Sequence, residues 1–385
     1  MIDLNTRTVL LVIGGSRAYG LHRSTSDVDV KGACVPPRAT VMGLFERFEQ
    51  VDDARALGPV AAWLSPEERN VGKVEGAIYD ARKVLRLATY ANPNILDLLF
   101  CREDEIRHAT DLGTAIREIR HLFITQKTQA TFAGYAHAQL KRIRNHRSWL
   151  LHPPRTQPTR AAFGLPEVAV VPKAQRDAAQ AAITKQLDAW KIDLEGLDES
   201  HKIEVKTAMA EVLGSITSAL GYGTDPEEGP WIAAARTVGL DDNLIEALRA
   251  ERAFRSAQQH FSNYQRWTKE RNPARAALEA THGYDTKHGS HLVRLLRMAG
   301  EIIETGKVHV WRGPSPDGPA DHEELRAIRS GAWSFDELIE WSDAQTKRLR
   351  IVVEQGKSVV PAGPDRAAID AFAQAWLTRA LSEHP

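Results

Sequence analysis

The sequence predicts an α+β protein, in which a small core of strands and helices is followed by a mostly α-helical domain. An apolar run at residues 9–13 ends at Gly14 and Gly15, which indicates a buried strand. Polar and apolar residues then alternate over residues 27–32, as in a second strand. Beyond residue 105, apolar side chains recur with the helical period, forming the stripe Phe132, Tyr135, Ala136, Gln139, Leu140 and Ile143.

The length of 385 residues is enough for two or three domains. We expect a catalytic core over residues 1–105 and a helical domain over residues 106–385. Gly, Pro and acidic residues near 222–230 indicate a further boundary inside the helical part. Within the core, residues 82–90 and 95–100 are predicted helices, separated by Asn92, Pro93 and Asn94.

The turn after the first predicted strand has the composition of a phosphate-binding loop. Gly14 and Gly15 allow a sharp turn and a close approach to a ligand. Ser16 is positioned to cap a short helix, whose free backbone N–H groups attract phosphate oxygens. The turn therefore predicts a site for the phosphates of a nucleotide.

Two aspartates follow Ser16 by eleven and thirteen residues. Because side chains alternate along a strand, Asp27 and Asp29 lie on one face, and Val28 and Val30 face the core. Neighbouring carboxylates are costly unless a cation joins them, and oxygen ligands of this kind suit Mg²⁺. Two such ions about 4 Å apart can promote phosphoryl-type displacement. We therefore expect a site for two Mg²⁺ ions, which Mn²⁺ can replace.

This stretch resembles the signature of the DNA polymerase β-type nucleotidyltransferase superfamily, through Ile13, Gly15, Ser16, Asp27 and Asp29. The resemblance implies a mixed sheet with flanking helices and transfer of NMP from an NTP to a hydroxyl. It also implies a third carboxylate on a following strand.

For the third carboxylate we favour Glu75, which would bind metal or act as the base toward the hydroxyl. Asp80 is the alternative. It falls on the opposite face of the same predicted strand, and an N-cap of the helix that begins near Ala81 explains it better.

Three longer blocks are similar to the RNA-repair-associated branch of the superfamily, called RlaP and grouped with YcgL-like predicted nucleotidyltransferases. The blocks are GGSRAYGLHRSTSDVDVKG, YDARKVLRLATYANPNILDLLF and RNPARAALEATHGYDTKHGSHLVRLLRMAGEIIETGKVHV. The resemblance implies an RNA end, tRNA-like, as the acceptor. The same core also modifies protein hydroxyls and small molecules, so these acceptors remain alternatives. A non-catalytic module that binds nucleotide or RNA is a further alternative, which the intact pair of aspartates disfavours.

A predicted helix over residues 285–306 carries a basic face opposite its apolar stripe. We expect Lys287, His291 and Arg294, together with Arg17 beside the glycine turn, to contact the nucleotide. The alternative for the helix is a set of surface charges paired with Glu301 and its neighbours.

An RNA-binding surface must be local, because 50 basic residues balance 50 acidic ones. The helix through residues 137–147 concentrates basic and histidine groups, and Lys141, Arg144 and Arg147 are its candidate RNA contacts. A solvated helix face is the alternative.

The remaining composition predicts a soluble cytoplasmic protein with no membrane partner. The two cysteines, Cys34 and Cys101, form no disulfide or metal framework and are expected in the core. No apolar run approaches the ~20 residues that span a bilayer, and the N-terminal residues lack the basic region of a secretory signal.

Overall fold

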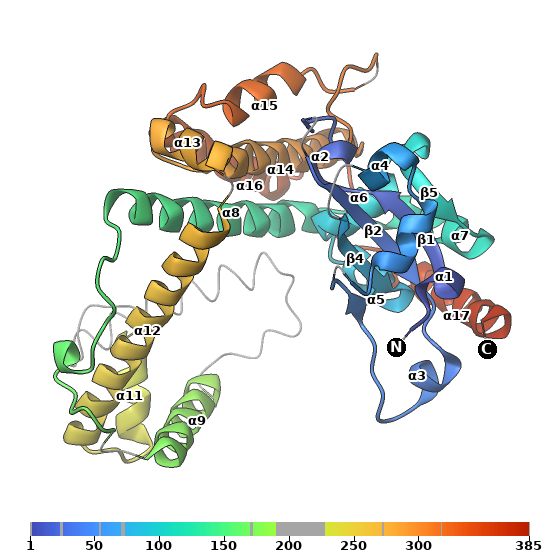
Figure 1. Ribbon diagram of the computed structural model, residues 1–385. Coiled ribbons are helices and arrows are strands. Elements are labelled where there is room, and N and C mark those ends of the chain that lie inside the picture. The colour runs from blue at the N-terminus through green and yellow to red at the C-terminus, as the bar shows by residue number, and fades with distance from the viewer. Residues whose placement is uncertain are drawn as a thin grey trace. The chain divides into compact units, whose positions relative to one another are not determined.

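The computed structural model describes residues 2–23, 26–53, 55–70, 74–169, 172–189, 228–271, 273–316 and 318–384 (Figure 1). The chain divides into two compact units. The first comprises residues 1–145 and 281–385, and the second comprises residues 146–280. This division differs from the expected boundary at residue 105. The other expected boundary, near 222–230, falls on residues 222–227, outside the described residues, and on the start of α11 (Glu228–Thr237).

The described residues of the first unit form a mixed five-stranded sheet, which agrees with the predicted α+β core. Its order is β3-β4-β2-β1-β5. Strands β2 and β4 run parallel, and the other neighbours are antiparallel. The strands are β1 (Thr8–Ile13), β2 (Val28–Cys34), β3 (Gln50–Val51), β4 (Val74–Asp80) and β5 (Ile106–Ala109).

Helices surround this sheet in the first unit. From the N-terminal part come α1 (Leu4–Arg7), α2 (Gly15–Ala18), α3 (Arg38–Met42), α4 (Pro66–Asn70), α5 (Ala81–Ala88), α6 (Pro93–Phe100), α7 (Asp111–Glu118) and most of α8 (Lys127–Leu151). From the C-terminal part come α14 (Thr286–Thr305), α15 (His322–Arg329), α16 (Phe335–Glu354) and α17 (Arg366–Glu383).

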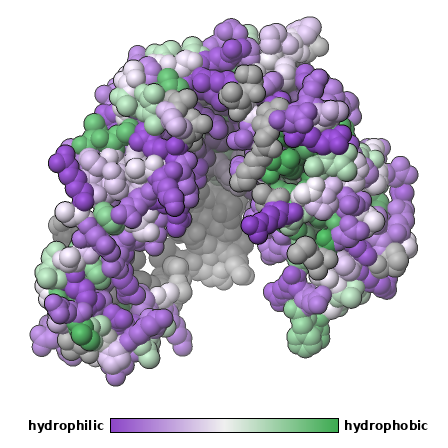
Figure 2. All heavy atoms as spheres, in the orientation of Figure 1, coloured by the Kyte–Doolittle hydropathy of each residue, from purple (hydrophilic) through white to green (hydrophobic). Residues whose placement is uncertain are grey.

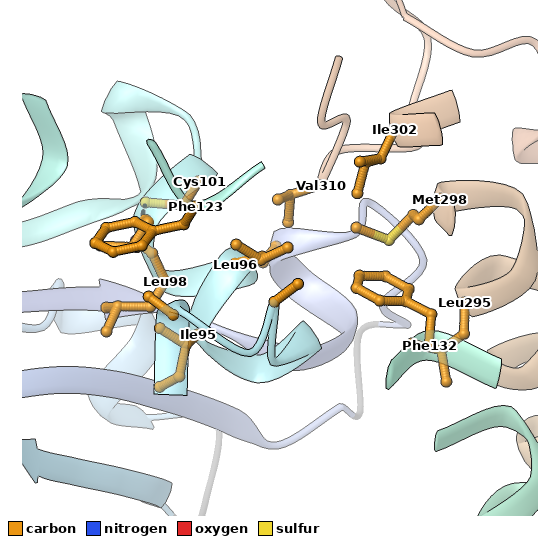
Figure 3. Packing of buried hydrophobic residues seen from close by; sticks show 14 of the residues in the cluster. Ile95, Leu96, Leu98, Cys101, Phe123, Phe132, Leu295, Met298, Ile302 and Val310 are labelled. Atoms are coloured by element: carbon orange, nitrogen blue, oxygen red, sulfur yellow. Dashed lines mark hydrogen bonds between the residues drawn. The ribbon is translucent and has the colours of Figure 1, made fainter. Parts of the chain in front are cut away.

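Helix α14 explains why the C-terminal residues join the first unit. It begins at the N-cap Asp285 and ends at Gly306, whose φ is 69°. Its predicted apolar stripe is fully buried and includes Leu292, Leu295, Leu296, Ala299, Ile302 and Ile303. Figure 3 shows Leu295 and Met298 beside Phe132 of α8, in the same cluster as Leu96 of α6. The N-terminal core and the C-terminal helices therefore share one hydrophobic core, which a boundary at residue 105 would cut.

The described part of the second unit includes the end of α8, a short 3-10 helix (Ala161–Phe163), α9 (Lys173–Ala189), α11, α12 (Asp242–Glu270) and most of α13 (Pro273–His282). Its small apolar cluster includes Ile183, Trp231, Ile245 and Leu248. Glu251 is buried and pairs with both Arg160 and Arg176.

Three surface and core features bear on the sequence expectations. Cys34 and Cys101 are buried and unpaired, as expected of small core residues. None of the helices in the described ranges is long and apolar enough to cross a bilayer. Hydrophobic side chains gather on the projecting loop that follows α3 (Figure 2), where Leu44 is 83% and Phe45 is 96% exposed.

Candidate functional site

A cavity of about 420 Å³ opens in the first unit beside the edge of the sheet where β1 ends. Its walls come from the turn after β1, from β2 and β4, and from α8 and α14. This size lies within the range of small-molecule pockets. The cavity thus brings together segments that are more than 250 residues apart in the sequence, Gly15 and Lys287 among them.

The glycine turn lies directly against the first strand carboxylate. The Gly14 N–H donates to the Asp29 carbonyl at 2.8 Å. Gly15 has a φ of 59°, and a Cβ at this position would lie 1.9 Å from Asp29 Oδ2. Only glycine fits this conformation and this contact without strain. The turn therefore holds Asp29 and Ser16 on the wall of one cavity.

The expected capping role of Ser16 is wrong. Helix α2 begins at Gly15, its N-cap is Gly14, and no side chain makes the cap hydrogen bond. Ser16 lies inside the first turn because the N-cap is Gly14, two residues earlier than expected. Its place on the cavity wall is unaffected.

The carboxylates predicted to bind metal share one electrostatic environment. In the parallel register of β2 and β4, Asp29 is paired with Glu75, so both side chains leave the same face of the sheet. Asp27 precedes β2 and is exposed, whereas Val28 and Val30 are buried on the other face, as predicted. Burial raises the pKa of Asp29, the ammonium groups of Lys287 and Lys31 oppose this rise, and the charges of Glu75 and Asp27 add to it.

These carboxylates do not form a tight cluster. Within the described ranges, the oxygens of Asp27, Asp29 and Glu75 do not all lie within 4.8 Å of one another. Like charges repel, so this spacing is the one expected of ionised groups. Of the three, only Asp29 borders the cavity. Asp29 and Glu75 nevertheless leave the same face of two adjacent strands, and carboxylate oxygens are ligands that suit Mg²⁺.

Asp80 has a structural role. It is buried, and it caps α5 by accepting a hydrogen bond from the Arg82 N–H at 2.8 Å. Its carboxylate also pairs with the Arg82 guanidinium at 2.5 Å. The N-cap interpretation of Asp80 is confirmed, which leaves Glu75 as the candidate third carboxylate.

A pair of substitutions separates these two acids. We expect Asp80→Ala to lower the free energy of unfolding by about 0.5–2 kcal/mol, the usual cost of losing an N-cap, with little change in the reaction rate. Glu75→Gln should do the reverse, because Glu75 is exposed and lies beside Asp29. Urea denaturation, and the rate of the NMP transfer that the sequence leads us to expect, measured on both variants, check this. A Glu75→Gln enzyme as fast as the parent would remove Glu75 from the site.

Helix α14 lines the opposite wall with the predicted basic residues. Lys287, His291 and Arg294 all border the cavity, and so does His288. Arg294 is 1% exposed and stacks on the Tyr19 ring, with its guanidinium carbon 3.5 Å from the ring centroid. Burial, and then the Arg294 charge, lower the pKa of His291 well below its usual range, so this imidazole is neutral at pH 7. Of these residues, Lys287 and Arg294 are cations, and the ring of His291 is neutral.

Beneath the cavity lies a charged network that the sequence interpretation did not include. Lys31 Nζ is 2.8 Å from Asp97 Oδ2, and the Tyr19 hydroxyl donates to the same carboxylate. Burial alone would raise the pKa of Asp97, but Lys31 and Arg294 hold it below its ordinary value. Two signals could have found these residues. Lys31 follows Asp29 by two positions, hence on the same face of β2, and Asp97 is a lone acid in an apolar helix.

The other predicted contacts lie elsewhere. Arg17 does not border the cavity. Its guanidinium donates to the Ser26 carbonyl at 3.2 Å and so holds the backbone next to Asp27. Lys141 and Arg144 are exposed on α8 and do not border the cavity, whereas the neighbouring Arg142 does. Arg147 belongs to the second unit. The role of Lys141, Arg144 and Arg147 in RNA binding therefore stays a prediction.

The sheet, the glycine turn and the paired strand carboxylates together define a polymerase β-type nucleotidyltransferase core. Residues 3–151 match the model of RlaP, the RNA repair pathway DNA polymerase beta family. The match covers less than half of the chain, and it agrees with the family that the motifs of this segment resemble. No curated protein and no solved structure matches the chain. The family match ends before α14, so the cavity lining, and not this match, supports the expected place of Lys287, His291 and Arg294 at the site.

Proposed function

We propose that the first unit transfers NMP from an NTP to a hydroxyl at an RNA end, in a reaction that requires Mg²⁺. The observation that carries the proposal is the contact of Gly15 with Asp29, which places a phosphate-binding turn against a carboxylate paired with Glu75. The RNA acceptor is supported by the RNA repair family whose model matches residues 3–151.

In this proposal one set of side chains binds the metal ions and another set contacts the phosphates. Asp27, Asp29 and Glu75 would hold two Mg²⁺ ions, which supply charge neutralisation and activation of the attacking oxygen. The turn at Gly15 and Ser16 contacts the phosphates, and Lys287 and Arg294 neutralise their charge from the opposite wall. Neutral His291 offers a hydrogen bond without adding charge.

The bond changes follow from this placement. The acceptor oxygen forms a bond to the α-phosphorus, and the bond from that phosphorus to the oxygen bridging the α- and β-phosphates breaks. Glu75 is exposed and paired with Asp29 across the two strands, and it is the group that accepts the proton of the hydroxyl if it does not hold metal. Pyrophosphate leaves toward Lys287, whose ammonium group stabilises its developing charge.

The first experiment tests the donor and the acceptor together. The full chain is incubated with Mg²⁺ and each NTP labelled at the α-phosphate, in the presence of total RNA or of cell protein, beside an Asp27→Ala/Asp29→Ala control. We expect label in RNA only with the intact aspartates. Label in protein would contradict the RNA acceptor and identify a protein hydroxyl as the acceptor. Label in neither would contradict the RNA acceptor and favour a small-molecule acceptor or a non-catalytic module.

Metal binding should respond to pH through Asp29. Its raised pKa means that protons compete with Mg²⁺ at a higher pH than for an ordinary aspartate, whose pKa is about 3.9. We therefore expect the affinity for Mg²⁺ to weaken on acidification, beginning above that ordinary range. Calorimetric titration with Mg²⁺ over a series of pH values measures this. An Asp29→Asn variant should lose this pH dependence along with most of the affinity.

A further inference from the structure

A second cavity lies in the first unit, away from the reaction site. It has a volume of about 460 Å³ and lies among α5, the start of α8 and α17. Four cationic side chains border it, and Asp370 is its one acidic residue. The cations are Arg82, Arg86, Lys127 and Arg366. None of these residues has a role in the proposed reaction. We call this cavity the basic groove.

The lining of the basic groove combines positive charge with flat apolar surface. Leu85, Ile369 and Trp376 form buried parts of its wall. Tyr90 borders it with 47% of its surface exposed. Lys127 Nζ lies 4.8 Å from the centroid of the Tyr90 ring. Cations beside an exposed aromatic ring are the features by which proteins bind single-stranded nucleic acid, through phosphates and stacked bases.

Two of the cations are available for phosphate. Arg86 and Arg366 are exposed, and neither forms an ion pair with any residue in the described ranges. Arg82, in contrast, is engaged by Asp80. An anionic ligand would therefore gain contacts to Arg86 and Arg366 without breaking an existing ion pair.

One short segment joins the basic groove to the reaction cavity. Thr131 of α8 donates to the Tyr90 carbonyl at 2.8 Å, and Asn92 donates to the Tyr135 hydroxyl at 2.7 Å. Two residues further on, Asn94 borders the reaction cavity. Residues 90–94 thus run alongside α8 from one cavity to the other, and their ends are at most about 14 Å apart.

The face of α8 beside this segment continues the connection. Lys127 borders the basic groove, and Gln139 and Arg142 border the reaction cavity. The intervening Thr131 and Tyr135 are half-buried and follow at four-residue steps, which places them on the same face of the helix. Polar and aromatic groups therefore line the route between the cavities.

We propose that the basic groove binds the single-stranded segment of the RNA acceptor that precedes its reacting end. Phosphates contact Arg86, Arg366 and Lys127, a base stacks on Tyr90, and the terminal hydroxyl reaches Glu75 along α8. This inference rests on the proposed function, because it names the binding site of that reaction's acceptor. The groove fits RNA better than a globular protein, because it combines cations, which bind phosphates, with the exposed ring of Tyr90, on which a base can stack.

Binding is measured without the reaction, on the full chain without NTP. The probe is a fluorescent single-stranded RNA of about 12 nucleotides, within the range of known site sizes. We expect Arg86→Glu/Arg366→Glu to weaken binding tenfold or more. Neutralising the same two residues as Arg86→Ala/Arg366→Ala should lower the slope of log affinity against log salt by about 1.4, at about 0.7 per phosphate contact.

A matched control is Arg350→Glu on α16, which makes the same charge change at a half-exposed arginine bordering neither cavity. It should bind RNA like the parent. Tyr90→Ala should weaken binding about fivefold or more, and Tyr90→Phe should restore it, because stacking needs only the ring. Equal affinities for the parent and for Arg86→Glu/Arg366→Glu would overturn the inference, and so would a loss as large in Arg350→Glu.

Kinetics separate this inference from the proposed function. With a long RNA acceptor, the Arg86→Glu/Arg366→Glu variant should raise KM for RNA and leave KM for NTP unchanged. With a dinucleotide acceptor, too short to reach the groove, parent and variant should react alike. A parent that transfers NMP to RNA, with a variant whose KM for RNA is unchanged, overturns the groove alone. A parent that labels protein and binds no RNA overturns both.

Discussion

The Asp29→Asn variant should lose at least about 1000-fold in the rate of NMP transfer. Asp29 is the carboxylate that touches the glycine turn, borders the reaction cavity and pairs with Glu75 across the sheet. Losing a metal-holding charge costs several kcal/mol of transition-state stabilisation, and each 1.36 kcal/mol is a factor of ten. Single-turnover transfer at saturating NTP and Mg²⁺ measures the loss.

The same substitution should leave the melting temperature unchanged or higher. Burial raises the pKa of Asp29 in the folded chain above that in the unfolded chain. The folded state therefore binds the proton more tightly, and the penalty of the ionised group is absent below the unfolded pKa and complete above the folded pKa. At pH 7 Asn removes that penalty. The matched control is Asp343→Asn, at an exposed site on α16. Retained transfer in Asp29→Asn would contradict the assignment of the site.

The Gly15→Ala variant should reduce both stability and activity. Its Cβ would lie 1.9 Å from Asp29 Oδ2, and its φ of 59° is unfavourable for alanine. We expect a loss of about 1–3 kcal/mol in the free energy of unfolding. Transfer should fall about 100-fold or more, because displacing Asp29 by about 1 Å misaligns the reacting groups.

Gly134→Ala is the control for this second variant. Gly134 is an exposed residue of α8, and a Cβ there meets nothing within 4 Å. Alanine should therefore stabilise the helix by about 0.5–1 kcal/mol and leave transfer unchanged. Urea denaturation and transfer assays on both variants decide the matter. If Gly15→Ala were as stable and as active as Gly134→Ala, the contact between the turn and Asp29 would have no functional role.

Local patterns predicted the strand and helix elements of the site well. The apolar run before Gly14 is β1, and the alternation around Asp29 is β2. Helix α14 begins at the N-cap Asp285 and ends at Gly306 in the left-handed conformation, as the sequence predicts. These features depend on neighbours within a few residues, which a single sequence contains.

The same local patterns do not predict which distant segments pack against one another. Nothing in the periodicity of α14 says that its apolar stripe is buried with Phe132 and Leu96 of the N-terminal part. The boundary was therefore expected at residue 105, although β5 and α7 follow it and continue the first unit. The network of Lys31, Asp97 and Tyr19 was missed for the same reason, since its members are up to 78 residues apart.

The discontinuity of the first unit has a consequence for how the protein is made. Trp376 of α17 donates to the Leu112 carbonyl, and α14 fills the core beside α8. During translation the strands and their carboxylates are therefore synthesised long before α14 and α17, the helices that complete the core of the first unit. Until α14 and then α17 have been synthesised, the apolar surfaces that each of them covers lack their native partner. The first unit therefore cannot complete its core until the second unit has been synthesised, and exposed apolar surface during that interval favours aggregation.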